Sequence, residues 1–146
     1  MKCFILFLVI ILAVFAAGCR GTDKSTNYVK INNQQFVVEI ADNDEERSQG
    51  LSGQEKLVYD HGLLFIFPEA SEYGFWMKQM NFAIDIIWIN GNTIVDIKEN
   101  LQPVNWDTPD SELTIYYPQK PADKVLELLN GTCQKYNIKI GDRVEL

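Results

Sequence analysis

The fold of this chain is decided by the segment Ala83-Ile84-Asp85-Ile86-Ile87-Trp88-Ile89-Asn90-Gly91. Residues 83–89 are mostly β-branched or aromatic, and they form the strongest predicted strand in the chain. Asn90-Gly91 is the dipeptide best suited to a type I′ hairpin turn, and residues 93–97 follow it as the expected partner strand. The segment therefore predicts a central antiparallel hairpin.

Further strands are predicted on both sides of this hairpin. Residues 28–31 and 36–40 are β-prone and flank a polar turn, which is typical of a second hairpin. Residues 62–67 are continuously apolar up to Pro68, which indicates a strand buried on both faces and ended by the proline. The remaining extended segments are residues 75–78, residues 113–117 and the turn and strand of residues 138–146.

Two short helices are expected beside these strands. Asp42 or Asn43 would cap a helix of one or two turns that ends at Gly50, with acidic residues in its first turn. Residues 130–136 would form the second helix. Residues 125–129 are open between a helix, which their propensity favours, and a strand. About seven short strands with one or two short helices predict an α+β domain that is mostly β, with an antiparallel sheet.

Length and charge narrow the class of protein. The 146 residues are enough for one domain, and 47% hydrophobic, 23% charged and 12% aromatic residues are typical of a globular chain. The formal net charge is −7 and the pI is near 4.6. Because an acidic surface repels phosphate and the basic residues are scattered singly, we expect no nucleic-acid partner.

The first 18 residues are typical of an export signal. One lysine precedes an apolar run of about a dozen residues, which is shorter than the ~20 residues that span a bilayer. Small residues, Ala16-Ala17-Gly18, then stand directly before Cys19, as in the lipobox of bacterial lipoproteins. We expect residues 1–18 to be a lipoprotein signal peptide, residues 19–27 to be a polar tether, and residues 28–146 to be the globular domain. Acylated Cys19, carrying palmitate or a similar chain, would anchor the protein to the cell envelope, facing the periplasm or the cell exterior.

The remaining cysteine and histidine chemistry is sparse. Loss of residues 1–18 and lipidation of Cys19 would leave Cys133 as the single thiol, so no intramolecular disulfide is expected. Zinc needs about four Cys or His ligands, and the mature domain offers His61 and Cys133. The acidic segment 42–44 lacks the glycine and the glutamate of a calcium loop. We therefore predict no metal and no cofactor, and a buried, non-catalytic thiol at Cys133.

Several stretches in order resemble one family over residues 29–146. The most specific is Phe75-Trp76-Met77-Lys78 followed seven residues later by Asp85, with Arg47-Ser48-Gln49-Gly50-Leu51 before it and Gly141-Asp142-Arg143-Val144 after it. This pattern resembles the uncharacterised bacterial and archaeal family known as domain of unknown function 192. The resemblance implies a mostly β, barrel-like domain and favours a strand at residues 125–129. It implies no activity.

Arg47, Lys78 and Asp85 are the first candidate site. Asp85 lies in a strand that is apolar on both faces, so its carboxylate needs a partner. Arg47 or Lys78 would supply it, either as an internal ion pair that fixes the register of the sheet or as part of a cleft that binds an anionic or polyhydroxylated ligand. In both cases Asp85 is expected to be ionised.

Aromatic residues are the second candidate site. Trp76 shares a strand face with Lys78, and Trp106 lies on a loop between Pro103 and Pro109, where it is expected to be exposed. These rings, with those of Tyr73, Phe75, Tyr116 and Tyr117, could stack on sugars or peptides or could belong to the core.

Two functions follow from these patterns. The first is a non-enzymatic, membrane-tethered accessory domain of the cell envelope that binds a small polar ligand or an envelope protein. The alternative is a small hydrolase or transferase with Asp85 or His61 as acid or base, because enzymes place a titratable group at the base of a pocket. Of the two, the non-enzymatic function is favoured and the enzyme is the alternative.

Overall fold

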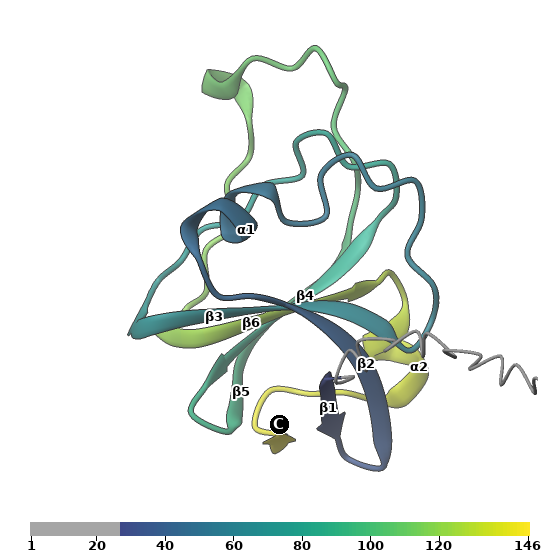
Figure 1. Ribbon diagram of the computed structural model, residues 1–146, viewed down its shortest axis with the longest axis vertical. Helices are drawn as coiled ribbons and strands as arrows, with labels where there is room; N and C mark the ends of the chain where they lie inside the picture. The colour runs from purple at the N-terminus through teal and green to yellow at the C-terminus, as the bar shows by residue number, and fades with distance from the viewer. Residues whose placement is uncertain (1–26) are drawn as a thin grey trace, which may run out of the picture.

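Seven strands form one curled sheet in residues 27–146, the part of the chain that this computed structural model describes (Figure 1). The elements in chain order are β1 (Asn27–Ile31), β2 (Gln34–Ala41), α1 (Asp44–Gln49), β3 (His61–Ser71), β4 (Ile84–Asn90), β5 (Thr93–Leu101), the 3-10 helix η1 (Asp110–Glu112), β6 (Ala122–Leu129), α2 (Thr132–Tyr136) and β7 (Val144–Glu145). The prediction of a mostly β, barrel-like α+β domain with short helices is confirmed.

The sheet curls far enough for its two edges to meet at one end. The strand order is β5-β4-β6-β3-β2-β1-β7, and every neighbouring pair is antiparallel except β2 and β3. At the edges Thr93 bridges Arg143, and the Ile94 amide donates to the Asp142 carbonyl at 3.0 Å. The result is a half-barrel whose edge strands are partly covered by each other.

The three central strands, β3, β4 and β6, are buried on both faces. In β4 the side chains of Ile84, Ile86 and Trp88 pack on the outer face of the sheet, whereas Ile87 and Ile89 pack inside the curl. Phe36, Leu64, Leu126 and Val144 belong to the inner cluster, and Leu51, Phe65, Met77 and Val125 belong to the outer one. Because the outer cluster is covered by α1 and by loops, those loops are where a pocket can form.

Residues 125–129 are part of strand β6, as the family resemblance implied and against their helical propensity. Val125 is buried in the outer cluster and Leu126 and Leu128 in the inner one, so the apolar residues serve both faces. β3 and β4 flank β6 and pair with its backbone on both edges. Tertiary pairing therefore overrides the weak preference for a helix.

The end of β3 and the turn after β4 differ from the prediction. β3 does not end at Pro68 but continues to Ser71, because its register with β6 shifts between Ile66 and Ser71 and the proline needs no ladder hydrogen bond there. Asn90 pairs with Thr93, so Gly91 and Asn92 form the hairpin turn. Only Gly91 of these two has a positive φ, 57°, which is the pattern of a type II′ turn rather than the predicted type I′ turn.

Two predicted strands are mostly loop. Residues 75–78 and 113–117 share one bridge, between Phe75 and Tyr116. The expectation of a regular strand in either segment is wrong, because neither reaches the edge of the main sheet. Instead they join the loops that cover the outer face (Figure 1).

Helix α1 begins and ends as its sequence predicts. The side chain of Asn43 accepts a hydrogen bond from the Glu46 amide at 3.0 Å, and Gly50 ends the helix with φ 52°. Among residues 27–146, no helix is long and apolar enough to cross a membrane. The predicted signal peptide and Cys19 lie outside the described residues.

Candidate functional site

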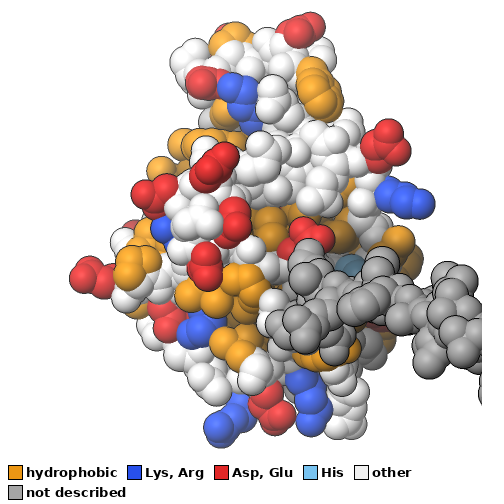
Figure 2. All heavy atoms as spheres, in the orientation of Figure 1, with side chains coloured by type: hydrophobic (Ala, Val, Ile, Leu, Met, Phe, Trp, Pro, Cys, Tyr) orange, Lys and Arg blue, Asp and Glu red, His pale blue; other side chains and the backbone are white. Residues whose placement is uncertain are grey.

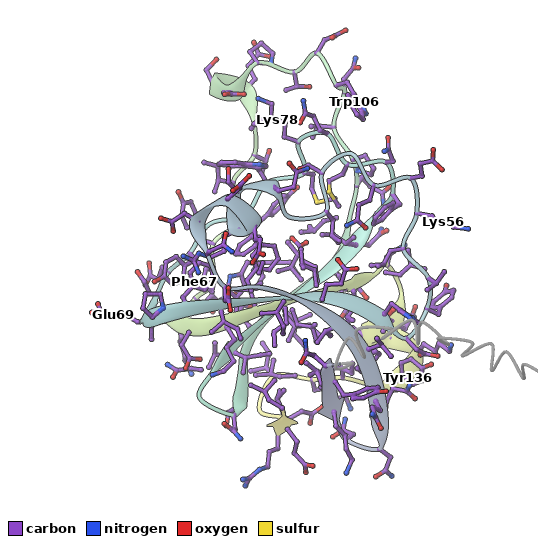
Figure 3. The ribbon with its side chains drawn as sticks, in the orientation of Figure 1. Lys56, Phe67, Glu69, Lys78, Trp106 and Tyr136 are labelled. Carbon is purple, nitrogen blue, oxygen red and sulfur yellow. The ribbon has the colours of Figure 1, made fainter. Side chains whose placement is uncertain are left out.

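A pocket of about 310 Å³ lies beside α1 on the outer face of the sheet. One side is formed by Arg47, Ser48 and the turn that follows α1, and Glu127 of β6 also lines it. The remaining wall is mainly aromatic: Gly74 and Met80 accompany the rings of Phe65, Phe67, Tyr73, Phe75 and Trp76. We call this cavity the Glu127 pocket; Figure 3 labels Phe67, which lies beside the sheet below α1.

The aromatic wall is held by ring contacts. Phe67 and Tyr73 stack with ring centroids 3.6 Å apart, and Phe65 meets Phe75 edge to face at 4.9 Å. Phe75 in turn meets Trp88 of β4 edge to face, and the Trp88 indole donates to the Tyr73 carbonyl at 3.1 Å. These contacts tie the loop after β3 to the core, so the wall is preformed.

Arg47 is fixed at the rim of the pocket. Its Nη1 donates to the carbonyls of Asp42 and Ile66, at 2.6 and 2.8 Å, and its Nη2 donates to Asp44 at 2.7 Å. The guanidinium also lies 5.4 Å from the centroid of the Phe67 ring. These bonds use three of the five N–H donors of the guanidinium, so two remain.

Glu127 is the group at this site that sequence reasoning missed. Its Cα lies opposite Leu63 of β3 and Ile86 of β4, and its side chain is 5% exposed. The buried Oε2 has no hydrogen-bond partner among the described residues. Burial disfavours the charged form and raises the pKa of Glu127 to about 8, so the carboxyl keeps its proton at neutral pH.

A sequence signal for Glu127 exists but depends on the conformation of its segment. An acid inside Val125-Leu126-Glu127-Leu128-Leu129 must be buried if the segment is a central strand. In the helix that propensity favours, the same residue lies on a solvated face. Because residues 125–129 were open between helix and strand, the sequence did not predict that Glu127 is buried.

The predicted site residues are not all brought together. Arg47 and Trp76 line the Glu127 pocket, and Trp76 is 47% exposed. Lys78 pairs with Asp110 of η1 among the loops at the top of Figure 3, and Trp106 lies in the same region. Trp106 is 52% exposed, as expected, and lies outside the pocket.

Asp85 is held by backbone amides, so the predicted ion pair with Arg47 or Lys78 is wrong. Its Oδ1 accepts from the Asn100 amide and its Oδ2 from the Cys133 amide, both at 2.9 Å. The reason is the direction of the side chain. Asp85 points to the inner face and reaches the start of α2, whereas Arg47 and Lys78 lie beyond the outer face near α1.

Cys133 and His61 do not form a nucleophile and base. Cys133 is buried at the start of α2, and this burial, with the nearby Asp85 carboxylate second, raises the pKa of its thiol. His61 is exposed at the start of β3, where Nδ1 lies 3.3 Å from the Tyr59 carbonyl. Among residues 27–146, no three His, Cys, Asp or Glu side chains gather as metal ligands would.

Residues 27–146 match the sequence profile of DUF192, described as an uncharacterized ACR. The chain belongs to the DUF192 family. A UPF0127 protein of Pyrococcus furiosus is 29% identical over 124 residues, which cover 82% of this chain and 94% of the relative. The residue pattern around Trp76, Lys78 and Asp85 therefore identified the family correctly.

Two solved structures have a fold similar to that of this chain. A Sinorhizobium meliloti protein described as a candidate transcription regulator superposes with a TM-score of 0.73 and 31% identity, over 81% of this chain and 91% of its own. A Novosphingobium aromaticivorans protein of unknown function gives a TM-score of 0.74 and 25% identity, over 83% of this chain and 85% of its own.

We expect Asp85→Asn to lower the free energy of unfolding by about 1–3 kcal/mol, because its amide group would face one of the two backbone N–H donors. Lys78→Met is the control, since its pair with Asp110 is exposed and is worth under ~1 kcal/mol. Urea unfolding at pH 7 measures both. An Asp85→Asn variant as stable as the parent would show that the two amide contacts contribute little.

We expect Glu127→Gln to remove a pH dependence of stability. The folded state holds the Glu127 proton up to a pKa of about 8, whereas the unfolded chain releases it near pH 4.3. Between about pH 5 and 8 the folded state therefore binds more protons than the unfolded chain does. As the pH rises through this range, the free energy of unfolding of the parent falls by up to ~1.4 kcal/mol per pH unit relative to that of the variant.

Urea unfolding of both proteins across this range measures the difference. The exposed strand residue Glu39 supplies the control variant Glu39→Gln, which should keep the pH dependence of the parent. Equal pH profiles for the parent and Glu127→Gln would mean that Glu127 is already ionised in the folded protein.

Proposed function

We propose that this DUF192 protein is a membrane-tethered, non-enzymatic binding domain of the bacterial cell envelope, and that its ligand is a small molecule in the Glu127 pocket. One observation carries the proposal: Glu127 lines a preformed pocket and has a buried carboxyl oxygen without a hydrogen-bond partner in residues 27–146. Proteins satisfy almost all buried polar atoms, and each exception has a cost of about 1–3 kcal/mol. A ligand that bonds to Glu127 would remove this cost.

The rest of the pocket supports a ligand of small size. Binding sites for small molecules are concave and mainly apolar, with a few polar groups that orient the ligand, and their volumes begin near ~300 Å³. The Glu127 pocket has about 310 Å³, an aromatic wall, and a few polar side chains that include Arg47 and Glu127. Trp76 is half exposed at this wall and offers a face on which a planar group can stack.

Catalysis is the second candidate, and it would use Glu127 rather than Asp85 or His61. A carboxyl that keeps its proton at neutral pH has the property of a general acid. Acid–base or nucleophilic chemistry also needs an activated second group. The hydroxyl of Ser52, at the pocket rim, donates to the Lys78 carbonyl at 3.1 Å instead of to a base. Binding therefore fits the lining residues better than catalysis does.

The tether is supported by the sequence before the domain. Ala16-Ala17-Gly18-Cys19 has the small residues and the cysteine of a lipobox, and residues 20–26 are polar. Diacylation of Cys19 would supply the two lipid chains that stable anchoring requires. The net charge of −7, with acidic side chains over the face that carries α1 (Figure 2), favours a small molecule or protein over nucleic acid as the partner, even though one relative is described as a candidate transcription regulator.

Lipidation predicts that Cys19→Ser abolishes incorporation of an alkyne-labelled palmitate into the protein in a bacterial host. Cys3→Ser is the matched control, because Cys3 precedes the predicted cleavage site and its loss should leave the label in place. The measurement is click labelling of the membrane fraction. Continued labelling of Cys19→Ser would disprove this anchor.

If a ligand binds in the Glu127 pocket, Ser48→Trp should abolish its binding. Ser48 is an exposed residue of α1 that lines the pocket, so a large ring there fills the cavity without disturbing the core. Ser111→Trp is the control, because Ser111 is exposed on η1 and lies outside the pocket. Ligand-observed NMR with aromatic fragments should give hits for the parent and Ser111→Trp only. Identical hits for all three proteins would place binding elsewhere.

A further inference from the structure

We propose that the Glu127 pocket selects small planar ligands whose carbonyl or carboxylate oxygen accepts a hydrogen bond from the Glu127 carboxyl, and that it excludes organic cations of the same shape. This inference rests on the proposed binding function and names its ligand class. It is carried by the unpartnered carboxyl, the fixed guanidinium and the flat aromatic wall.

The Glu127 carboxyl sets the polarity of the ligand's inner end. Its nearest neighbours in the flanking strands are Leu63 and Ile86, which offer no charge to stabilise a carboxylate. The carboxyl of this lining residue is therefore neutral at pH 7, and its O–H can donate a hydrogen bond. A ligand oxygen with a free lone pair completes this hydrogen bond, whereas a ligand that offers only N–H donors leaves the proton unpaired.

Arg47 sets the charge that the pocket tolerates. Its guanidinium already occupies the cation–π position over Phe67, so a second cation would meet a ring that is in use and a positive charge beside it. The carboxylate that pairs with Arg47, that of Asp44, is fully exposed and screened by water. The two free N–H donors of Arg47 attract a carboxylate instead.

The other ionisable group of the pocket does not change this balance. Tyr73 lines the wall and is stacked on Phe67, and its hydroxyl donates to the Glu69 carbonyl at 2.9 Å. Arg47, Tyr73 and Glu127 are the titratable side chains among the lining residues. The Glu127 pKa of about 8 lies between pH 6 and pH 9, so a pH dependence of binding that is lost in Glu127→Gln reports on this carboxyl.

Three fluorinated probes of equal shape test the selection. They are 4-fluorobenzamide, 4-fluorobenzoate and 4-fluorobenzamidine, which are neutral, anionic and cationic through this pH range. The full-length protein in phosphatidylcholine nanodiscs is titrated at pH 6 and pH 9, with ¹⁹F relaxation of the probe as the readout and empty nanodiscs as the blank.

We expect the amide and the benzoate to bind and the amidine to bind at least tenfold more weakly at pH 6. With a Glu127 pKa of about 8, ten of eleven molecules are ionised at pH 9, so the affinity for the amide falls about tenfold. Glu127→Gln keeps an N–H donor without the titration. It should bind the amide equally at both pH values.

The outcomes separate the inference from the proposed function. Amidine binding at pH 6 that is as tight as amide binding, or tighter, would overturn the selection for oxygen acceptors while leaving a functional pocket. Amide binding with the same pH dependence in the parent and in Glu127→Gln would also overturn it. If no probe binds at either pH, or if Ser48→Trp does not reduce binding, both the inference and the pocket function are wrong.

Discussion

Burial of three neighbouring strands on both faces is the constraint on which the rest of this structure depends. β3, β6 and β4 lie side by side between an inner and an outer apolar cluster. A polar side chain that is buried in these strands cannot reach bulk water, so it must find a partner or lose its charge. The outer cluster is covered by α1 and by loops rather than by a second sheet, and this irregular cover leaves room for a pocket.

The two buried acids of the central strands, Asp85 and Glu127, meet this constraint in different ways. Asp85 stays on the inner side, where two backbone N–H donors that β5 and α2 leave free bind its oxygens. Glu127 points to the outer side, where none of the described residues donates to its buried Oε2. One carboxyl therefore joins two elements of the fold, while the other keeps a proton and an unsatisfied atom. Proteins retain groups that do not favour stability mainly at functional sites, so the unpaired carboxyl of Glu127 is expected to have a function.

The site could be predicted only in part from the sequence. Arg47 and Trp76 were singled out and both line the pocket, because a short capped helix and a rigid aromatic segment flank it. Lys78 and Asp85 were grouped with them by spacing along the chain, yet they lie on opposite sides of the sheet. The spacing of residues along the chain does not show which face of the sheet a distant loop will cover. Glu127 escaped notice because its segment has helical propensity.

The sequence by itself determined the strands with strong apolar patterns, the cap and end of α1, and membership of the DUF192 family, since each depends on neighbouring residues or on a motif. Only the tertiary structure decided that residues 122–129 are a strand, because β3 and β4 pair with both of its edges. It also decided which acid is bound and which is left unpaired. That choice depends on which backbone amides the folded chain brings to each face, and no local pattern encodes it.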